Sequence, residues 1–137
     1  MKKLYLLIIS FCLLNCAPEE ILNQPQDNVV MQAITNGKWK VSSFIKGSSD
    51  ITSEFSSYTF QFKNNFTVDA LKNGNIENTG TWLANAIEKT IISNFPIASH
   101  PLNLLNGTFN IDSTTWTSVD ARLIENGESR TLKLIKI

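Results

Sequence analysis

The sequence predicts an all-β domain in which eight antiparallel strands form an up-and-down meander that closes into a small barrel, with a short helix or helical turn at one end. Three observations support this fold class. From Asn36 onward, apolar and polar side chains alternate with a period of two, aromatic and β-branched residues are enriched, and turn residues recur about every 8 to 14 positions. Closing such a meander removes the exposed strand edges that promote aggregation.

The first two strands show the alternation most clearly. A largely apolar face of the first strand is predicted for Trp39, Val41, Ser43 and Ile45. Phe44 falls on the opposite, more polar face. In the second strand the apolar face consists of Tyr58, Phe60 and Phe62. Both strands are therefore expected to be half-buried.

Asparagine and glycine mark the predicted hairpins. Asn64-Asn65 is expected to form a two-residue turn, since asparagine tolerates a positive φ. The third strand then has Phe66, Val68 and Ala70 as its apolar set. Lys72–Asn75 forms the next turn, and the favoured Asn126-Gly127 pair forms the last one.

The remaining strands follow from the same signals. They are expected from Gly80 onward and over residues 89–93, 107–112, 115–123 and 130–137. Phe95–Leu105 contains two prolines and suits a helical turn or a loop across the end of the sheet.

The start of the chain has the form of a secretory signal. Lys2 and Lys3 give a basic start, and the eleven-residue run Leu4–Leu14 is mostly apolar. Secretory signals contain such a run of about 7 to 15 residues, whereas a membrane-spanning helix needs about 20. The sequence therefore predicts a signal peptide over residues 1–15.

The segment Leu13-Leu14-Asn15-Cys16 resembles the lipobox of bacterial lipoproteins, although Asn15 replaces the usual small residue. In that family the cysteine is acylated and becomes the new N-terminus. The resemblance implies that Cys16 is the lipid attachment site and that its acyl chains anchor the protein in the bacterial outer membrane, facing the periplasm or the cell surface. Residues 17–20 resemble the acidic export signals of Bacteroidetes-type lipoproteins, and they fit a solvated linker equally well.

Residues 16–35 are interpreted as the lipidated cysteine and a flexible linker, and residues 36–137 as the β-domain. The linker is polar and interrupted by proline, but its last part, Val29–Ile34, is apolar enough to dock as a short helix on one end of the domain. One compact domain agrees with the length of the mature chain.

Removal of the signal changes the charge and the thiol content. It takes away Lys2, Lys3 and Cys12, which leaves a net charge of −2 and Cys16 as the remaining cysteine. No intramolecular disulfide can then support the fold. This charge also gives no basic surface for nucleic acid.

Several segments resemble small lipocalin-like domains of Bacteroidetes-type lipoproteins. Gly37-Lys38-Trp39 is similar to the Gly-x-Trp motif at the entry of the first lipocalin strand, and Gly-x-aromatic recurs at residues 80–82 and 107–109. The resemblance covers residues 36–137. It implies a lipocalin-like barrel whose tryptophan packs across the closed end. An immunoglobulin-like sandwich is the alternative fold, although it would more often require long Greek-key crossings.

Two functions follow from such a barrel, because eight strands enclose an interior that side chains fill or that holds one small ligand. The first is a membrane-anchored domain that binds a small hydrophobic or amphipathic molecule. Its cavity wall is assigned to Trp39, Tyr58, Phe60, Phe62 and Trp82. The alternative is a cell-envelope interaction module with a filled barrel, which contacts a protein or glycan through a sheet face or through its longest connections, residues 47–54 and 95–105.

Catalytic chemistry is not expected. His100 is the single histidine and lies in a loop, so no second imidazole or free thiol completes a nucleophilic or zinc constellation. The carboxylates occupy outward or turn positions, and no glycine-rich phosphate loop is present. The sequence therefore predicts a protein that is not an enzyme and needs no cofactor or metal.

Overall fold

Our computed structural model describes residues 24–137, and it describes side chains from Val29 onward. The fold is a single antiparallel sheet that closes on itself. Its strands are β1 (Trp39–Lys46), β2 (Ser49–Asp50), β3 (Tyr58–Phe62), β4 (Thr67–Lys72), β5 (Asn75–Asn85), β6 (Thr90–Asn94), β7 (Gly107–Thr114), β8 (Ser118–Glu125) and β9 (Glu128–Lys136). Eight of these strands form the barrel in chain order, and β2 is an additional short strand beside β1. The predicted fold class is confirmed.

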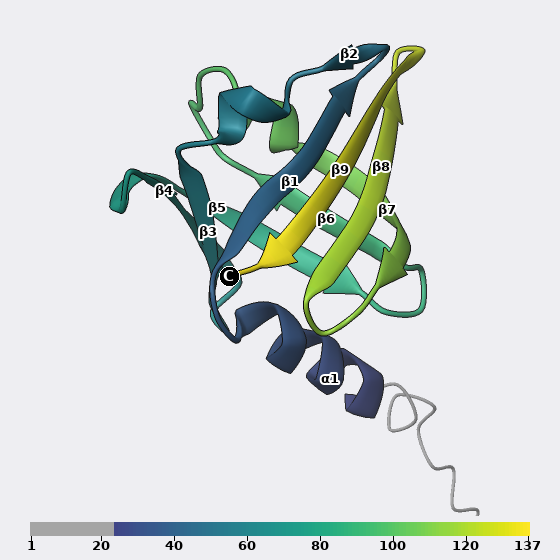
Figure 1. Cartoon of the computed structure of the whole chain (residues 1–137). Coiled ribbons are helices and arrows are strands. Elements are labelled where there is room, and N and C mark those ends of the chain that lie inside the picture. Colours follow the sequence, from purple (N-terminus) through teal and green to yellow (C-terminus); the bar gives the residue numbers. More distant parts are fainter. Residues whose placement is uncertain (1–23) are drawn as a thin grey trace, which may run out of the picture.

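The barrel closes between its first and last strands. The register of β1 and β9 runs from Trp39 opposite Lys136 to Lys46 opposite Arg130. On its other side, β1 pairs with β3 only where Trp39 lies opposite Phe60. Beyond this point the two strands diverge (Figure 1), and the 3₁₀ turn η2 (Thr52–Phe55) follows β2 in the connection between them.

The prediction that Phe44 lies on the polar face of the first strand is wrong. A β-bulge between Val41 and Ser43 shifts the alternation of β1 by one residue. Trp39 and Val41 point inward as expected, but beyond the bulge it is Phe44 that is fully buried, while Ser43 and Ile45 are half-buried. Phe44 packs on Phe55 of η2 with ring centres 5.0 Å apart, which fills the region where β1 and β3 diverge.

Two of the three asparagine turns form as predicted. Asn73 and Gly74 have φ values of 50° and 82°, and Asn126 and Gly127 have 51° and 78°. Positive φ at both central residues is the requirement of a type I′ hairpin, whose twist matches that of the strands.

The turn between β3 and β4 differs from its prediction. Phe66, not an asparagine, takes the positive φ of 64°, and it lies before β4 with 46% of its surface exposed. Its amide donates to the oxygen of Lys63, which closes a four-residue loop. The inward set of β4 is therefore Val68 and Ala70 without Phe66, and the Phe66 ring instead lies 6.1 Å from that of Trp82.

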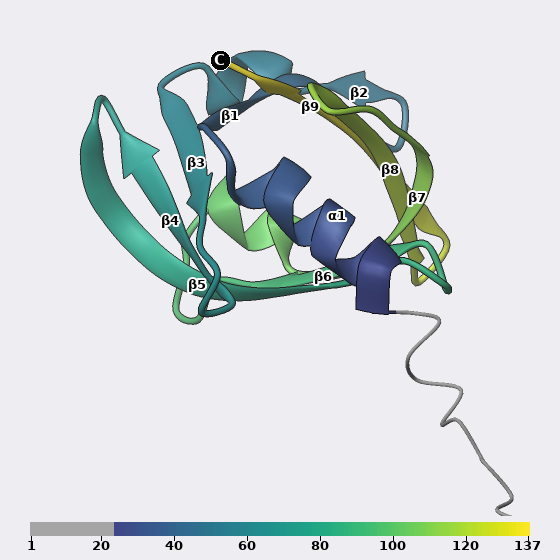
Figure 2. The same ribbon diagram turned by 90° about the horizontal axis from the view of Figure 1, so that it is seen from below.

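A helix covers one end of the barrel. Helix α1 (Gln24–Thr35) begins earlier than the short helix expected from Val29 and lies across the end at which β1 begins and β9 ends (Figure 1; Figure 2). The opposite end carries η2 and the 3₁₀ turn η3 (Leu102–Leu105), which confirms the helical turn expected in Phe95–Leu105. Its three leucines and Phe55 are buried, so side chains also close that end.

Candidate ligand pocket at the helix-covered end

Side chains fill the interior of the barrel. The void among them measures about 30 Å³, which is about the volume that one water molecule occupies in the liquid. Its walls are buried aliphatic and aromatic groups that include Phe60, Phe62, Phe95 and Phe109. Of the two alternatives for the barrel interior, the structure therefore supports the filled one, and a ligand the size of a lipid or cofactor has no room there.

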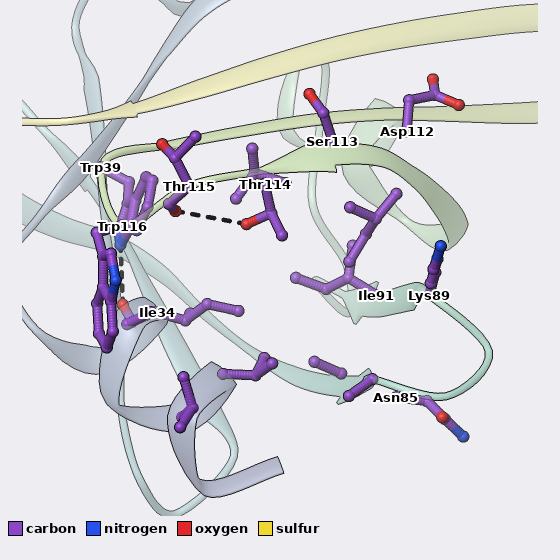
Figure 3. A pocket seen from close by; sticks show the side chains of 17 residues that line it. Ile34, Trp39, Asn85, Lys89, Ile91, Asp112, Ser113, Thr114, Thr115 and Trp116 are labelled. Carbon is purple, nitrogen blue, oxygen red and sulfur yellow. Dashed lines mark hydrogen bonds between the residues drawn. The ribbon is translucent and has the colours of Figure 1, made fainter. Parts of the chain in front are cut away.

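A larger cavity lies between α1 and the end of the barrel. It has a volume of about 460 Å³, within the range of about 300 to 1,000 Å³ that is typical of small-molecule sites. Most of its 17 lining residues are apolar (Figure 3). The apolar members are Val29, Val30, Ala33, Ile34, Trp39, Ala84, Ala86, Ile91, Ile111, Trp116 and Val119. We call this cavity the end pocket.

Distant parts of the chain form the two sides of the end pocket. Helix α1 contributes one side, through residues 29, 30, 33 and 34. The end of β5, the start of β6, the second half of β7 and the β7–β8 connection contribute the other, together with Trp39 of β1 and Val119 of β8 (Figure 3). Antiparallel pairing places these segments at one end of the barrel, since Ala84 lies opposite Ile91 and Ile91 opposite Phe109.

Hydrogen bonds fix the helical side of the end pocket to the barrel. The indole Nε1 of Trp39 donates to the main-chain oxygen of Ile34 at 2.8 Å. Lys136 Nζ donates to the oxygen of Ala33 at 2.9 Å and lies 5.1 Å from the centre of the Trp39 ring. The first and last strands of the barrel therefore hold the C-terminal turn of α1.

Polar side chains of the end pocket mostly have partners within the protein. Asn85 Oδ1 accepts hydrogen bonds from the amides of Ile87 and Glu88, which shapes the β5–β6 turn. Asp112 pairs with Arg122 at 2.9 Å. Lys89 is exposed and has no ion pair among the residues that the structure describes. The end pocket thus offers mainly apolar contact and a few polar groups at its edge.

The structure separates the five aromatic residues that were predicted to form a cavity wall. Trp39 lines the end pocket. Phe60 and Phe62 line the small void inside the barrel. Tyr58 and Trp82 line neither cavity; both are buried, and Trp82 Nε1 donates to the oxygen of Lys63 at 3.1 Å.

Sequence reasoning missed most of the end pocket. Trp116 was not among the predicted site residues, although an aromatic residue between Thr115 and Thr117 in a polar turn is unusual enough to have signalled a site. The apolar residues Val29–Ile34 were expected to dock on one end of the domain, but not to enclose a cavity there.

The groups with the clearest pKa shifts lie outside the end pocket. Burial raises the pKa of Tyr58 to about 12, and its hydrogen bond to the Glu77 carboxylate acts in the same direction. A hydrogen bond from Lys63 lowers the pKa of Asp69 against the opposing effect of burial. These groups join β3, β4 and β5, so their role in the described structure is to stabilise the barrel.

The remaining reactive groups do not gather at one place. His100 pairs with Glu54 between the β6–η3 connection and η2, at the end of the barrel opposite α1. In residues 24–137, no three His, Cys, Asp or Glu side chains are grouped as metal ligands. Within the same residues, no helix is long and apolar enough to cross a membrane. The predicted signal peptide and Cys16 lie outside the described residues.

Comparison with known proteins shows the fold and no family. No family model matches the sequence, and no curated protein matches it. Among solved structures, the chain is similar to a DUF4847 family protein from Bacteroides vulgatus ATCC 8482. The TM-score is 0.54 with 16% sequence identity, and the alignment covers 77% of this chain and 96% of that chain. At this identity the likeness supports the barrel fold alone.

Proposed function

We propose that this protein is a lipid-anchored domain of the bacterial cell envelope that binds one small hydrophobic or amphipathic molecule in the end pocket. A binding role, rather than a catalytic one, agrees with a pocket whose polar groups are few and mostly partnered within the protein. The observation that carries the proposal is the apolar cavity of about 460 Å³ beside a barrel interior with room for about one water molecule.

The size and chemistry of the end pocket support this function. Burial of apolar surface contributes about 25 cal/mol per Å², and the apolar side chains of α1 and the barrel end offer such surface on two sides. Lys89 and the Asn85 amide at the edge could orient a polar end of the molecule. The site differs from the one expected for a hollow lipocalin-like barrel, since it lies between α1 and the mouth of the barrel, where Ile91 and Val119 separate it from the small void deeper in the sheet.

The membrane anchor is proposed from the first segment of the chain. Lys2, Lys3 and the apolar run Leu4–Leu14 precede Cys16, which we propose carries the acyl chains. The outer membrane is then the place of action, with the domain in the periplasm or on the cell surface.

A fluorescence titration tests ligand binding. Trp39 and Trp116 line the end pocket, so a bound probe lies beside two of the three tryptophans and should quench their emission. The protein in detergent is titrated with 1-anilinonaphthalene-8-sulfonate, and saturable quenching with one site per chain is expected. Quenching without saturation would contradict the proposal.

A matched pair of variants locates the binding site. Ala84→Leu adds bulk on the side of β5 that faces the end pocket, and we expect it to weaken probe binding at least tenfold. Thr81→Leu adds bulk at an exposed position of the same strand and should leave the affinity unchanged. Equal affinities of both variants and the wild-type protein would show that the probe binds elsewhere.

A further inference from the structure

We propose that the end of the barrel covered by α1 rests on the lipid bilayer, so that the end pocket lies beside the membrane surface. This inference depends on the membrane anchor of the proposed function but not on ligand binding. The occupant of this surface is the interfacial region of the bilayer, where headgroups meet acyl chains. Two independent features point to it: the short distance along the chain from the anchor to α1, and the side chains exposed at this end.

The tether is short. Seven residues separate Cys16 from Gln24, the first residue of α1. A trans chain advances at most about 3.6 Å per residue, so the Cα atoms of Cys16 and Gln24 are at most about 29 Å apart. Strand β1, with 8 residues, is about 26 Å long. The tether therefore holds the α1 end of the barrel close to the bilayer, within about one barrel length.

The same end exposes large apolar side chains from five separate segments. The β3–β4, β5–β6 and β7–β8 connections, the C-terminus and α1 all meet there, because the strands alternate in direction (Figure 1). The exposed fractions are 49% for Val29, 46% for Phe66, 61% for Ile87, 57% for Trp116 and 61% for Ile137. We call these five residues the apolar rim.

The composition of the apolar rim fits a membrane interface. Tryptophan is enriched at the level of the lipid headgroups, because its ring is apolar and its N–H can reach water or a headgroup. Trp116 lies in a turn and is the most exposed of the three tryptophans. At the opposite end of the barrel the exposed large apolar residues are Ile76, Ile97 and Ile124, and none of them is aromatic.

The charges near the apolar rim favour no particular lipid headgroup. Lys38, Lys63 and Lys89 lie at this end together with Glu88 and Asp112, all with exposed side chains. Lys63 and Asp112 are paired with Asp69 and Arg122, respectively. Contact with the bilayer should therefore rely on apolar burial, with little dependence on anionic lipid or on salt. Since Trp116 and Val29 belong both to the apolar rim and to the end pocket, a molecule could pass between bilayer and pocket without crossing bulk water.

Quenching by brominated lipids tests this orientation. The full-length chain is purified from membranes, its N-terminal acylation is read by mass spectrometry, and it is incorporated into phosphatidylcholine vesicles with brominated acyl chains. Bromine quenches tryptophan at close contact, and Trp39 and Trp82 are buried in the domain. We expect partial quenching of the wild-type protein and its loss in Trp116→Phe.

Two further variants make the result decisive. Ile124→Trp in the Trp116→Phe background places an exposed tryptophan at the opposite end, and it should stay unquenched. Ala84→Leu should remain quenched, which separates bilayer contact from a lipid bound in the end pocket. Three outcomes would each overturn the inference. Trp116 and the tryptophan introduced at residue 124 could be quenched equally, Trp116 could remain unquenched, or the chain could fail to stay on the vesicles. The probe titration in detergent is unaffected by these outcomes.

Discussion

The indole nitrogen of Trp39 donates a 2.8 Å hydrogen bond to the main-chain oxygen of Ile34, and so the first strand of the barrel holds the last turn of the helix that covers it. The last carbonyls of a helix have no partners within the helix. Lys136 satisfies the neighbouring carbonyl of Ala33, and the amide of Asn36 satisfies that of Gln32. The position of α1, and with it the end pocket, therefore depends on a few named contacts.

Trp39→Phe should loosen α1. The change removes the hydrogen bond to Ile34 and leaves a small void, so we expect a loss of about 2 kcal/mol in the free energy of unfolding. Urea denaturation measures this loss. Amide hydrogen exchange of residues 29–35 should become faster, because the helix loses a hydrogen bond to β1.

Trp82→Phe is the matched control for this variant. It also loses an indole hydrogen bond, here to the oxygen of Lys63, but it lies away from α1. We expect a similar loss of stability without faster exchange in α1. If both variants accelerate exchange in residues 29–35 equally, Trp39 has no special role in holding the helix.

Lys136→Met should have a smaller effect of the same kind. Methionine keeps an apolar stem, but the hydrogen bond to Ala33 and the contact with the Trp39 ring are lost. We expect a loss of about 1 kcal/mol in unfolding free energy and faster exchange in α1. Lys133→Met breaks only an exposed ion pair with Asp120 and should cost less than about 0.5 kcal/mol. An equal effect of the two changes would argue against the Lys136 contact.

Protonation of Asp69 should lower the free energy of unfolding at acid pH. Asp69 is 4% exposed, accepts a 2.8 Å hydrogen bond from Thr79 and lies 2.5 Å from Lys63 Nζ. The hydrogen bond from Lys63 is the main cause of the lowered pKa of Asp69. Because the pKa is lower in the folded state, the stabilisation is complete above the unfolded pKa of about 3.9. It is lost as the pH falls through the lower folded pKa.

Asp69→Asn tests this pH dependence. The variant should lose about 2 kcal/mol at pH 7, because the charged hydrogen bond from Lys63 is gone. Between pH 7 and about pH 2, its stability should then fall less than that of the wild-type protein. Urea denaturation at several pH values compares the two proteins, and parallel curves would show that Asp69 contributes nothing to the acid dependence.

Gly80→Ala should destabilise the barrel. A Cβ at this position would lie 2.8 Å from the Phe95 ring and still closer to the main-chain oxygen of Asn94. We expect a loss of about 2 to 3 kcal/mol, as for other overpacked positions. Gly74→Ala is the control, since its Cβ would meet open space and the cost of about 1 to 2 kcal/mol comes from its φ of 82° alone. Equal thermal stabilities of the two variants would contradict the steric account.

Local chemistry explains what the sequence could predict of the fold. The Asn73-Gly74 and Asn126-Gly127 turns require residues that accept positive φ, and these pairs mark their hairpins directly. The alternation of buried and exposed residues in β3, with Tyr58, Phe60 and Phe62 inward, is equally local. Once these hairpins are placed, the strand order of the meander follows.

Tertiary contacts explain what the sequence could not predict. The bulge in β1 turns Phe44 inward, where it packs against Phe55. No local feature of the sequence marks this shift in the alternation of β1. Phe66 takes a positive φ that asparagine would adopt more readily, while its ring lies beside Trp82. The end pocket depends on where α1 lies, which is decided by contacts from Trp39 and from Lys136, about 100 residues apart in the chain.

The alanine methyl groups offer the most direct test of the end pocket. Ala33, Ala84 and Ala86 line it, whereas Ala70 and Ala121 are buried inside the barrel. In a protein labelled with ¹³C at alanine methyls, titration with 1-anilinonaphthalene-8-sulfonate should shift the first three signals along one saturation curve and leave the other two in place. Two results would contradict binding between α1 and the barrel end. One is that the signals of Ala70 and Ala121 shift saturably while those of the pocket alanines do not, and the other is that no alanine signal shifts saturably.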